Sequence, residues 1–247
     1  MKIAVITGAS SGMGKEFVRQ LEEAERFDEI WLIARRKDRM EELAGELHTK
    51  ARVIPLDLTD SNSIRKYGIL LDAAKPEVAV LVNAAGFGIF HKFTDCKPED
   101  IYGMIDLNDK ALVGMTYTSL PYMRAGGRII NLASASAFQP VPYINVYAAT
   151  KAFVLSFSRA LNVELQDRGI SVLAVCPFWT KTEFFDRARD DDTISYYSHY
   201  YTAEEVVTRA LEDLARGKDV SVCGAAVRGQ RLLVKLLPHR TVMKIWC

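Results

Sequence analysis

The first fourteen residues restrict the fold of this chain more than any other stretch. Residues 2–7 (KIAVIT) form an apolar, β-branched run, which predicts a buried strand. A turn with the spacing G-x-x-x-G-x-G follows at once, and a helical pattern begins at Gly12. Such a turn directs backbone N–H groups and the positive end of the helix at one point, which suits a phosphate group. The chain therefore opens with a predicted nucleotide-binding unit, although an ordinary glycine-rich strand–helix turn has the same spacing.

Short apolar runs alternate with longer helical patterns as far as about residue 222. We expect strands at 2–7, 29–34, 52–56, 78–83, 127–133, 170–176 and 219–223. We expect helices at 12–26, 37–48, 98–123, 146–168 and 203–216, with another after Asp60. Continuously apolar strands separated by helices predict an α/β, Rossmann-like, doubly wound, mainly parallel seven-stranded sheet with helices on both faces. No linker or repeat interrupts the pattern, so we expect a single domain over residues 1–247.

The composition excludes some classes of function. The formal net charge is +1, which gives no indication of a nucleic-acid partner. The cysteines are scattered, without a CxxC pair or metal-ligand spacing, which favours free thiols and no metal site. No secretory signal and no apolar run of membrane-spanning length is recognisable, so we expect a cytoplasmic protein. The cysteines are Cys96, Cys176, Cys223 and Cys247.

The residues after the second predicted strand bear on the choice of nucleotide. An NAD-binding site of this architecture usually has an acidic residue there, which holds the ribose 2′-hydroxyl. This chain has Arg35 and Arg36 instead. A guanidinium group suits a 2′-phosphate, so the pair predicts NADP(H) in preference to NAD(H). The alternative is that one arginine is only a solvated charge at the start of the next helix.

Three residues in the middle of the chain complete a recognisable pattern. Tyr147 and Lys151 have the spacing Y-x-x-x-K, and Ser134 precedes the tyrosine by thirteen positions. In this order, after the glycine-rich turn, they resemble the short-chain dehydrogenases/reductases over roughly residues 1–183. Further matches to that family are Asp57-Leu58, Asn83-Ala84-Ala85-Gly86 and Asn108.

The resemblance implies a set of site residues. The catalytic residues would be Ser134, Tyr147, Lys151 and Asn108. The cofactor-binding residues would be Gly8, Ser10, Ser11, Gly12, Met13, Gly14, Arg35, Arg36, Asp57, Leu58, Asn83, Ala84, Ala85, Gly86, Tyr147, Lys151, Pro177 and Thr182.

The chemistry of these side chains fits the exchange of a proton with a substrate oxygen. A free tyrosine has a pKa of about 10, and we expect the Lys151 ammonium to lower the pKa of Tyr147. Tyr147 would then act as the general acid or base, while Ser134 hydrogen-bonds the same oxygen. In the family the asparagine holds a water that links the lysine to solvent, a role that would fall to Asn108. Ser136 lies near Ser134 and would support it.

The substrate side departs from the family pattern. The family commonly has Pro-Gly after the sixth strand, whereas this chain has Pro177-Phe178. Residues 178–202 form the expected substrate loop, whose many aromatic residues favour a bulky apolar or ring-containing substrate. Alternatively, these aromatics anchor the loop or contact another subunit. The expected substrate contacts are Phe138, Tyr143, Phe178 and Trp179.

Residues 228–247 mix apolar and basic side chains, with Pro238 breaking any continuous helix. We expect this segment to pack against a neighbouring subunit, in a homodimer or homotetramer, rather than lie on a membrane surface. The leading hypothesis is an NADP(H)-dependent oxidoreductase that interconverts a small-molecule carbonyl and a secondary alcohol. The alternatives are a 3-oxoacyl thioester reductase and a non-catalytic NADP(H)-binding scaffold or redox sensor.

Overall fold

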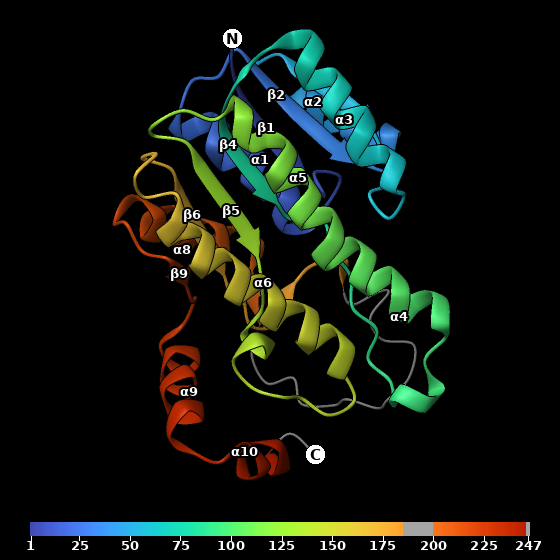
Figure 1. Ribbon diagram of the computed structural model, residues 1–247, viewed down its shortest axis with the longest axis vertical. Helices are drawn as coiled ribbons and strands as arrows, with labels where there is room; N and C mark the ends of the chain where they lie inside the picture. The colour runs from blue at the N-terminus through green and yellow to red at the C-terminus, as the bar shows by residue number, and fades with distance from the viewer. Residues whose placement is uncertain (185–199, 246–247) are drawn as a thin grey trace.

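The computed structural model describes residues 1–184 and 200–245. Its centre is a parallel sheet of seven strands in the order β3-β2-β1-β4-β5-β6-β9 (Figure 1). These strands are β1 (Lys2–Thr7), β2 (Glu29–Ala34), β3 (Ala51–Pro55), β4 (Glu77–Asn83), β5 (Arg128–Leu132), β6 (Ser171–Val175) and β9 (Val220–Ser221). A small second sheet pairs β7 (Thr180–Lys181) with β8 (Tyr201–Thr202).

The sheet is covered by helices on both faces, which confirms the predicted doubly wound α/β fold (Figure 1). Phe17, Met40 and Val207 bring α1, α2 and α8 onto one face, and Tyr67 and Met115 bring α3 and α5 onto the other. These helices, with α4 and α6, are α1 (Gly12–Ala24), α2 (Lys37–Glu46), α3 (Ser61–Ala74), α4 (Pro98–Ile105), α5 (Leu112–Ser119), α6 (Asn145–Glu164) and α8 (Ala203–Ala215).

The strand order fixes where a ligand can bind. The chain runs outward from β1 to β3 and then returns to β4 on the other side of β1. A crevice forms at the carboxyl ends of the strands where the order reverses. Thr7, the last residue of β1, connects this strand to the residues that follow β4. Its Oγ accepts hydrogen bonds from the backbone N–H groups of Ala84 (3.0 Å) and Ala85 (3.1 Å).

The long helix predicted over residues 98–123 is interrupted. α4 ends at Ile105, a π-helical turn spans Asp106–Ala111, and α5 follows. A π-turn inserts one extra residue into a helix and is frequent at functional sites. Here it buries Asn108, beside which Asp109 is partly buried. A short 3₁₀ turn, Leu120–Tyr122, ends the segment.

The C-terminal segment forms α9 (Ala225–Leu236) and α10 (His239–Ile245), with the predicted break at Pro238. Figure 1 shows both helices extending below the sheet and its covering helices. Val234 and Val242 are buried, whereas Leu236 is 82% exposed. Within the described residues, we find no helix with the length and apolar character needed to span a bilayer.

Candidate active site

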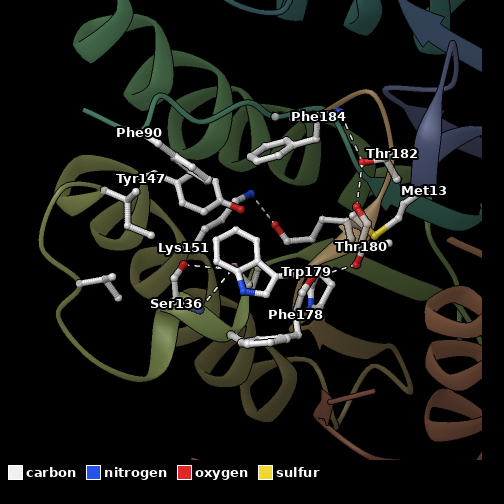
Figure 2. Close-up of a pocket in the computed structure, with 18 of the residues that line it drawn as sticks. Met13, Phe90, Ser136, Tyr147, Lys151, Phe178, Trp179, Thr180, Thr182 and Phe184 are labelled. Atoms are coloured by element: carbon white, nitrogen blue, oxygen red, sulfur yellow. Dashed lines mark hydrogen bonds between the residues drawn. The ribbon is translucent and has the colours of Figure 1, made fainter. Parts of the chain in front are cut away.

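Ser134, Tyr147 and Lys151 meet at the carboxyl end of the sheet, and all three side chains are buried. Ser134 follows the end of β5, whereas Tyr147 and Lys151 lie one turn apart at the start of α6. A spacing of four residues places two side chains on one face of a helix. Figure 2 shows Tyr147 and Lys151 bordering one cavity with the aromatic rings of neighbouring loops.

Lys151 is a buried cation with one close acceptor. Its Nζ donates a hydrogen bond to the carbonyl oxygen of Leu132 (2.7 Å) and lies 5.7 Å from the centroid of the Tyr147 ring. Burial lowers the pKa of Lys151 to about 8, because the charged ammonium loses solvation, and the negative charge of Asp109 opposes this shift. Lys151 is therefore mostly protonated at neutral pH but close to titration.

Tyr147 is held in its neutral form. Burial raises the pKa of Tyr147 to about 12, and a hydrogen bond with Ser134 only partly opposes this rise. The expectation that Lys151 lowers the pKa of Tyr147 is therefore not met in this structure, because desolvation of the phenolate outweighs the other effects. Tyr147 carries its proton at neutral pH.

Ser134 does not continue the strand, since β5 ends at Leu132. It caps a short 3₁₀ turn (Ala135–Phe138) that follows. Its Oγ accepts hydrogen bonds from the backbone N–H of Ser136 (3.1 Å) and from the Ser136 hydroxyl (3.0 Å). Ser136 thus fixes the orientation of the Ser134 hydroxyl and takes the supporting position expected for it.

Asn108 uses its amide to join three segments around Lys151. Its Nδ2 donates to the carbonyl oxygen of Phe87 (2.9 Å) and to the hydroxyl of Thr150 (3.0 Å). Its Oδ1 accepts from the backbone N–H of Phe87 (3.1 Å). A side chain on Gly86 would meet this Oδ1 at 2.9 Å and Lys151 Nζ at 3.4 Å, so Asn108 and Lys151 are close neighbours.

Asp109 is a member of this cluster that the sequence analysis missed. Burial raises the pKa of its carboxyl to about 7, and the charge of Lys151 opposes the rise. Its Oδ1 is buried and has no hydrogen-bond partner among the described residues. The sequence could have indicated Asp109 as a site residue, because its carboxylate directly follows the predicted site residue Asn108. Asp109 and Lys151 therefore influence each other's charge.

The glycine-rich turn leaves room for backbone only. Gly8 has a φ of +68°, and a side chain there would lie 2.8 Å from the backbone nitrogen of Ala85. A side chain on Gly14 would lie 2.2 Å from the carbonyl oxygen of Gly8. The start of α1 therefore approaches the turn as closely as a phosphate-binding cradle requires, and the residues present fit a dinucleotide.

A groove runs from this turn along the ends of the strands, and most of the predicted cofactor-binding residues line it. Asn83 lies below the groove instead, where its amide donates to Asn131 Oδ1 (2.9 Å) and to the Thr116 hydroxyl (3.1 Å). The predicted residues along the groove are Gly8, Ser10, Ser11, Gly12, Met13, Gly14, Arg35, Arg36, Asp57, Leu58, Ala84, Ala85, Gly86 and Thr182.

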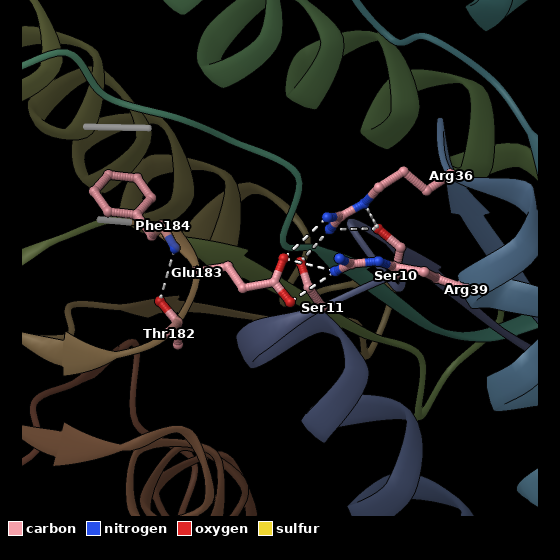
Figure 3. Close-up of polar contacts among 7 residues, drawn as sticks. All are labelled: Ser10, Ser11, Arg36, Arg39, Thr182, Glu183 and Phe184. Atoms are coloured by element: carbon pink, nitrogen blue, oxygen red, sulfur yellow. Dashed lines mark hydrogen bonds and ion pairs between the residues drawn. The ribbon is translucent and has the colours of Figure 1, made fainter. Parts of the chain in front are cut away.

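Arg36 and Arg39 share one ion-pair partner, the carboxylate of Glu183. Arg36 and Arg39 both contact the carboxylate of Glu183, and Arg36 also donates to the hydroxyls of Ser10 and Ser11 (Figure 3). Sequence reasoning selected Arg35, which lines the groove beside Arg36, and missed Arg39, which lies three residues after Arg36 on the helix. This anion-binding corner fits a phosphate group by its charge and its donors.

A mainly apolar pocket lies beside Tyr147 and includes Lys151, Ser134 and Pro177. The Phe184 ring lies 5.5 Å from the Tyr147 ring between centroids, and the Phe90 ring lies 5.8 Å from it (Figure 2). The other apolar or amide side chains of the pocket include Phe178, Trp179, Val141, Ile144, Gln139 and Gln230.

The structure departs from the sequence analysis on one wall of this pocket. The expected contacts Phe178 and Trp179 line it, whereas Phe138 and Tyr143 do not. Phe138 instead lies with its ring centroid 5.5 Å from the guanidinium of Arg231, from α9, and Tyr143 packs against the apolar cluster that includes Phe90 and Tyr147. The expected loop aromatics Phe185, Tyr196 and Tyr197 lie outside the described residues.

Comparison with known proteins identifies the family. The family model for short chain dehydrogenases matches residues 2–193, so the chain belongs to this family of oxidoreductases. A sulfoacetaldehyde reductase from Chromohalobacter salexigens is 37% identical over 188 residues, which cover 74% of this chain and 74% of that protein. A very-long-chain 3-oxoacyl-CoA reductase from Danio rerio is 36% identical over 190 residues, which cover 74% of this chain and 60% of that protein.

Solved structures with this fold cover almost the whole chain. A short-chain dehydrogenase from Sphingobium yanoikuyae in complex with NADPH has a TM-score of 0.81 and 30% identity, covering 99% of this chain and 96% of its own. A bulky-bulky ketone specific alcohol dehydrogenase from Comamonas testosteroni has a TM-score of 0.78 and 27% identity, covering 99% of this chain and 94% of its own.

Proposed function

We propose that this chain is an NADP(H)-dependent oxidoreductase that interconverts a bulky, apolar ketone and its secondary alcohol, with Tyr147 as the acid or base. One observation carries the proposal: Tyr147 lines a mainly apolar pocket together with Ser134 and Lys151. The same pocket shares Met13, Gly86 and other residues with the groove of the glycine-rich turn. A substrate carbonyl and a nicotinamide would thus meet beside the tyrosine.

Tyr147 and Ser134 would each have a definite task in this reaction. A bound nicotinamide supplies the hydride to the carbonyl carbon or accepts it from the alcohol. Tyr147 gives its proton to the carbonyl oxygen during reduction, and its raised pKa, about 12, keeps that proton available at neutral pH. Ser134 donates a hydrogen bond to the same oxygen, where negative charge develops. These properties favour the direction of ketone reduction.

The preference for NADP(H) rests on charge at the end of β2. The strand is followed by Arg35 and Arg36, with Arg39 one turn further on, and no carboxylate occupies the position that holds a free 2′-hydroxyl. The NADPH complex of the Sphingobium relative agrees with this preference.

The apolar walls of the pocket support the class of substrate. Phe90, Phe178, Trp179 and Phe184 offer aromatic surface on several sides, which favours a large apolar group over a small hydroxy acid. The Comamonas alcohol dehydrogenase, which is named as specific for bulky-bulky ketones, supports the same class of substrate.

A 3-oxoacyl thioester reductase is the second candidate, and the Danio rerio relative favours it. Its substrate would carry the reacting ketone two carbons from a thioester, with a long polar carrier outside the pocket. Acetoacetyl-CoA and a matched bulky aryl ketone distinguish the two candidates, because only the thioester reductase would favour the carrier-linked substrate.

We also propose a cytoplasmic homo-oligomer. Cys96, Cys176 and Cys223 are free thiols among the described residues, which fits a reducing compartment. The apolar side chains exposed on α9 offer a surface for a second copy.

The first test is the oxidation of NADPH, and separately of NADH, across a panel of bulky ketones. Turnover with NADPH should fall by about two to four orders of magnitude in Tyr147→Phe, since general acid catalysis contributes about that much. Tyr143→Phe is the matched control, because it removes a hydroxyl outside the pocket, and its turnover should stay near that of the parent. Undiminished turnover in Tyr147→Phe would contradict the proposed role. A non-catalytic scaffold would bind NADPH without turning over any ketone.

A further inference from the structure

Glu183 occupies the anion-binding corner of the groove. Its carboxylate is 2.9 Å from Arg36 Nη1 and 2.7 Å from Arg39 Nη1, measured to the nearest carboxylate oxygens. Arg36 also donates to Ser10 Oγ (3.2 Å) and to Ser11 Oγ (2.7 Å). Figure 3 shows the two arginines approaching from the side of α2 and Glu183 approaching from the opposite wall. One carboxylate therefore pairs with two guanidinium groups beside two serines of the glycine-rich turn, which leaves a net positive charge at this corner.

This carboxylate stands in for a phosphate. Hydrogen bonds from Arg36 and then Arg39 hold the pKa of Glu183 below its usual value, so the group is an anion at neutral pH. Arginine forks and serine hydroxyls are also the donors that bind a phosphate monoester in proteins. Glu183 and a phosphate would compete for the same donors, because both are anions and repel each other at close range.

The neighbours of Glu183 show that it lies on a bridge across the groove. A side chain on Gly12 would meet Thr182 at 3.3 Å, so Thr182 packs on the glycine-rich turn. Phe184 places its ring 5.5 Å from that of Tyr147, between centroids. Residues 182–184 thus connect the phosphate-binding turn, the arginines and the proton donor.

We propose that Glu183 is a specificity-determining residue that competes with the cofactor's 2′-phosphate for Arg36 and Arg39. This inference rests on the proposed NADP(H) preference. A 2′-phosphate must displace the carboxylate to reach the two arginines, whereas a nucleotide without that phosphate leaves the ion pairs intact. Glu183 therefore weakens the binding of nucleotides that carry a 2′-phosphate and not of those that lack it. It thereby reduces the preference for NADP(H) over NAD(H).

Calorimetric titration of the full chain tests this competition without turnover. The probes are adenosine 2′,5′-bisphosphate, which has the 2′-phosphate, and adenosine 5′-monophosphate, which lacks it. Glu183→Gln should tighten binding of the bisphosphate by about three- to fivefold, the range expected for a partly exposed ion pair. Its affinity for the monophosphate should stay unchanged.

Two further variants separate this effect from a general change in charge. Glu41→Gln removes a carboxylate from the same helix as Arg39, but Glu41 pairs with Lys37 and not with the arginine corner, so it should change neither affinity. Arg39→Gln should weaken the binding of the bisphosphate. In the Arg39→Gln background, Glu183→Gln should raise the affinity for the bisphosphate by less than it does in the parent chain, because the shared partner Arg39 is missing.

The possible outcomes distinguish a failure of the proposed NADP(H) preference from a failure of the proposed role of Glu183. If the parent chain binds the bisphosphate no more tightly than the monophosphate, the NADP(H) preference fails and the inference fails with it. If the parent prefers the bisphosphate but Glu183→Gln leaves the ratio of affinities unchanged, or tightens both nucleotides equally, then only the role of Glu183 is overturned.

Discussion

At the scale of single residues, the proposed proton chemistry would depend on two side chains whose pKa values burial moves toward neutral pH, Asp109 and Lys151. Lys151 has a pKa of about 8 and Asp109 a pKa of about 7, and each charge favours the charged form of the other. Above about pH 7 the Asp109 carboxylate is ionised and helps to keep Lys151 protonated. Below that pH the carboxyl is neutral and its effect on Lys151 disappears. We therefore expect Asp109 to affect the reaction indirectly, through the charge of Lys151.

Asp109→Asn should change the pH profile of ketone reduction in a defined direction. Without the carboxylate the pKa of Lys151 falls below about 8, so the ammonium is lost at a lower pH. The alkaline limb of kcat/KM should move to lower pH, while the two profiles should converge below about pH 7, where Asp109 is already neutral. The measurement is kcat/KM for a bulky ketone between pH 5 and 10.

Asp106→Asn is the control for this experiment. It removes a carboxylate from the same π-helical turn, but Asp106 pairs with Lys110 on the exposed side. Its alkaline limb should coincide with that of the parent chain. Coincident profiles for Asp109→Asn as well would exclude the charge coupling.

At the scale of elements, the junction between β1 and α1 depends on the absence of a side chain. Gly14→Ala would place a methyl group 2.2 Å from the Gly8 carbonyl oxygen, so α1 must shift. We expect a loss of stability of about 1–3 kcal/mol, as for other overpacked sites, together with weaker NADPH binding. Urea unfolding and fluorescence titration measure the two effects.

Gly45→Ala makes the same chemical change where nothing lies within 4 Å of the new methyl group. Because Gly45 is in α2, alanine should stabilise the chain by about 0.5 kcal/mol and leave NADPH binding unaltered. Equal effects of the two substitutions would show that the turn is not closely packed against α1.

The sequence was most reliable for features that a local residue pattern determines, such as the positions of the strands. Apolar runs placed all seven strands of the central sheet, and the predicted ends differ from the observed ones by at most two residues, whereas the short strands β7 and β8 were not predicted. The π-turn at Asp106–Ala111 was missed because a helix with one extra residue keeps an almost helical apolar pattern. Arg39 was missed because the relevant neighbour of Arg36 is one helical turn away, and adjacency in sequence favoured Arg35.

At the scale of the whole molecule, the pocket joins segments that are far apart in the chain. Gln230 reaches it from α9, and Phe138 turns outward to Arg231 on the same helix. Neither position follows from local periodicity, since each depends on where the C-terminal helices dock. The family pattern could locate Tyr147 and Lys151 from their spacing and their order after Ser134 and the glycine-rich turn, but the walls of the substrate pocket required the tertiary structure.

α9 also carries the large exposed apolar side chains of the C-terminal segment. Leu232, Leu233 and Leu236 on α9 are 64%, 50% and 82% exposed. Leu236 follows Leu232 by four positions and Leu233 by three, so the three side chains share one side of the helix, and we expect a second copy of the chain to cover them. Replacing the three leucines with serine should therefore reduce the mass measured by light scattering to that of one chain. Replacing Ile69, an exposed apolar residue of α3, with serine should leave the mass unchanged. If the parent chain is already a monomer, or if the triple variant keeps the parent's mass, α9 does not form the subunit contact.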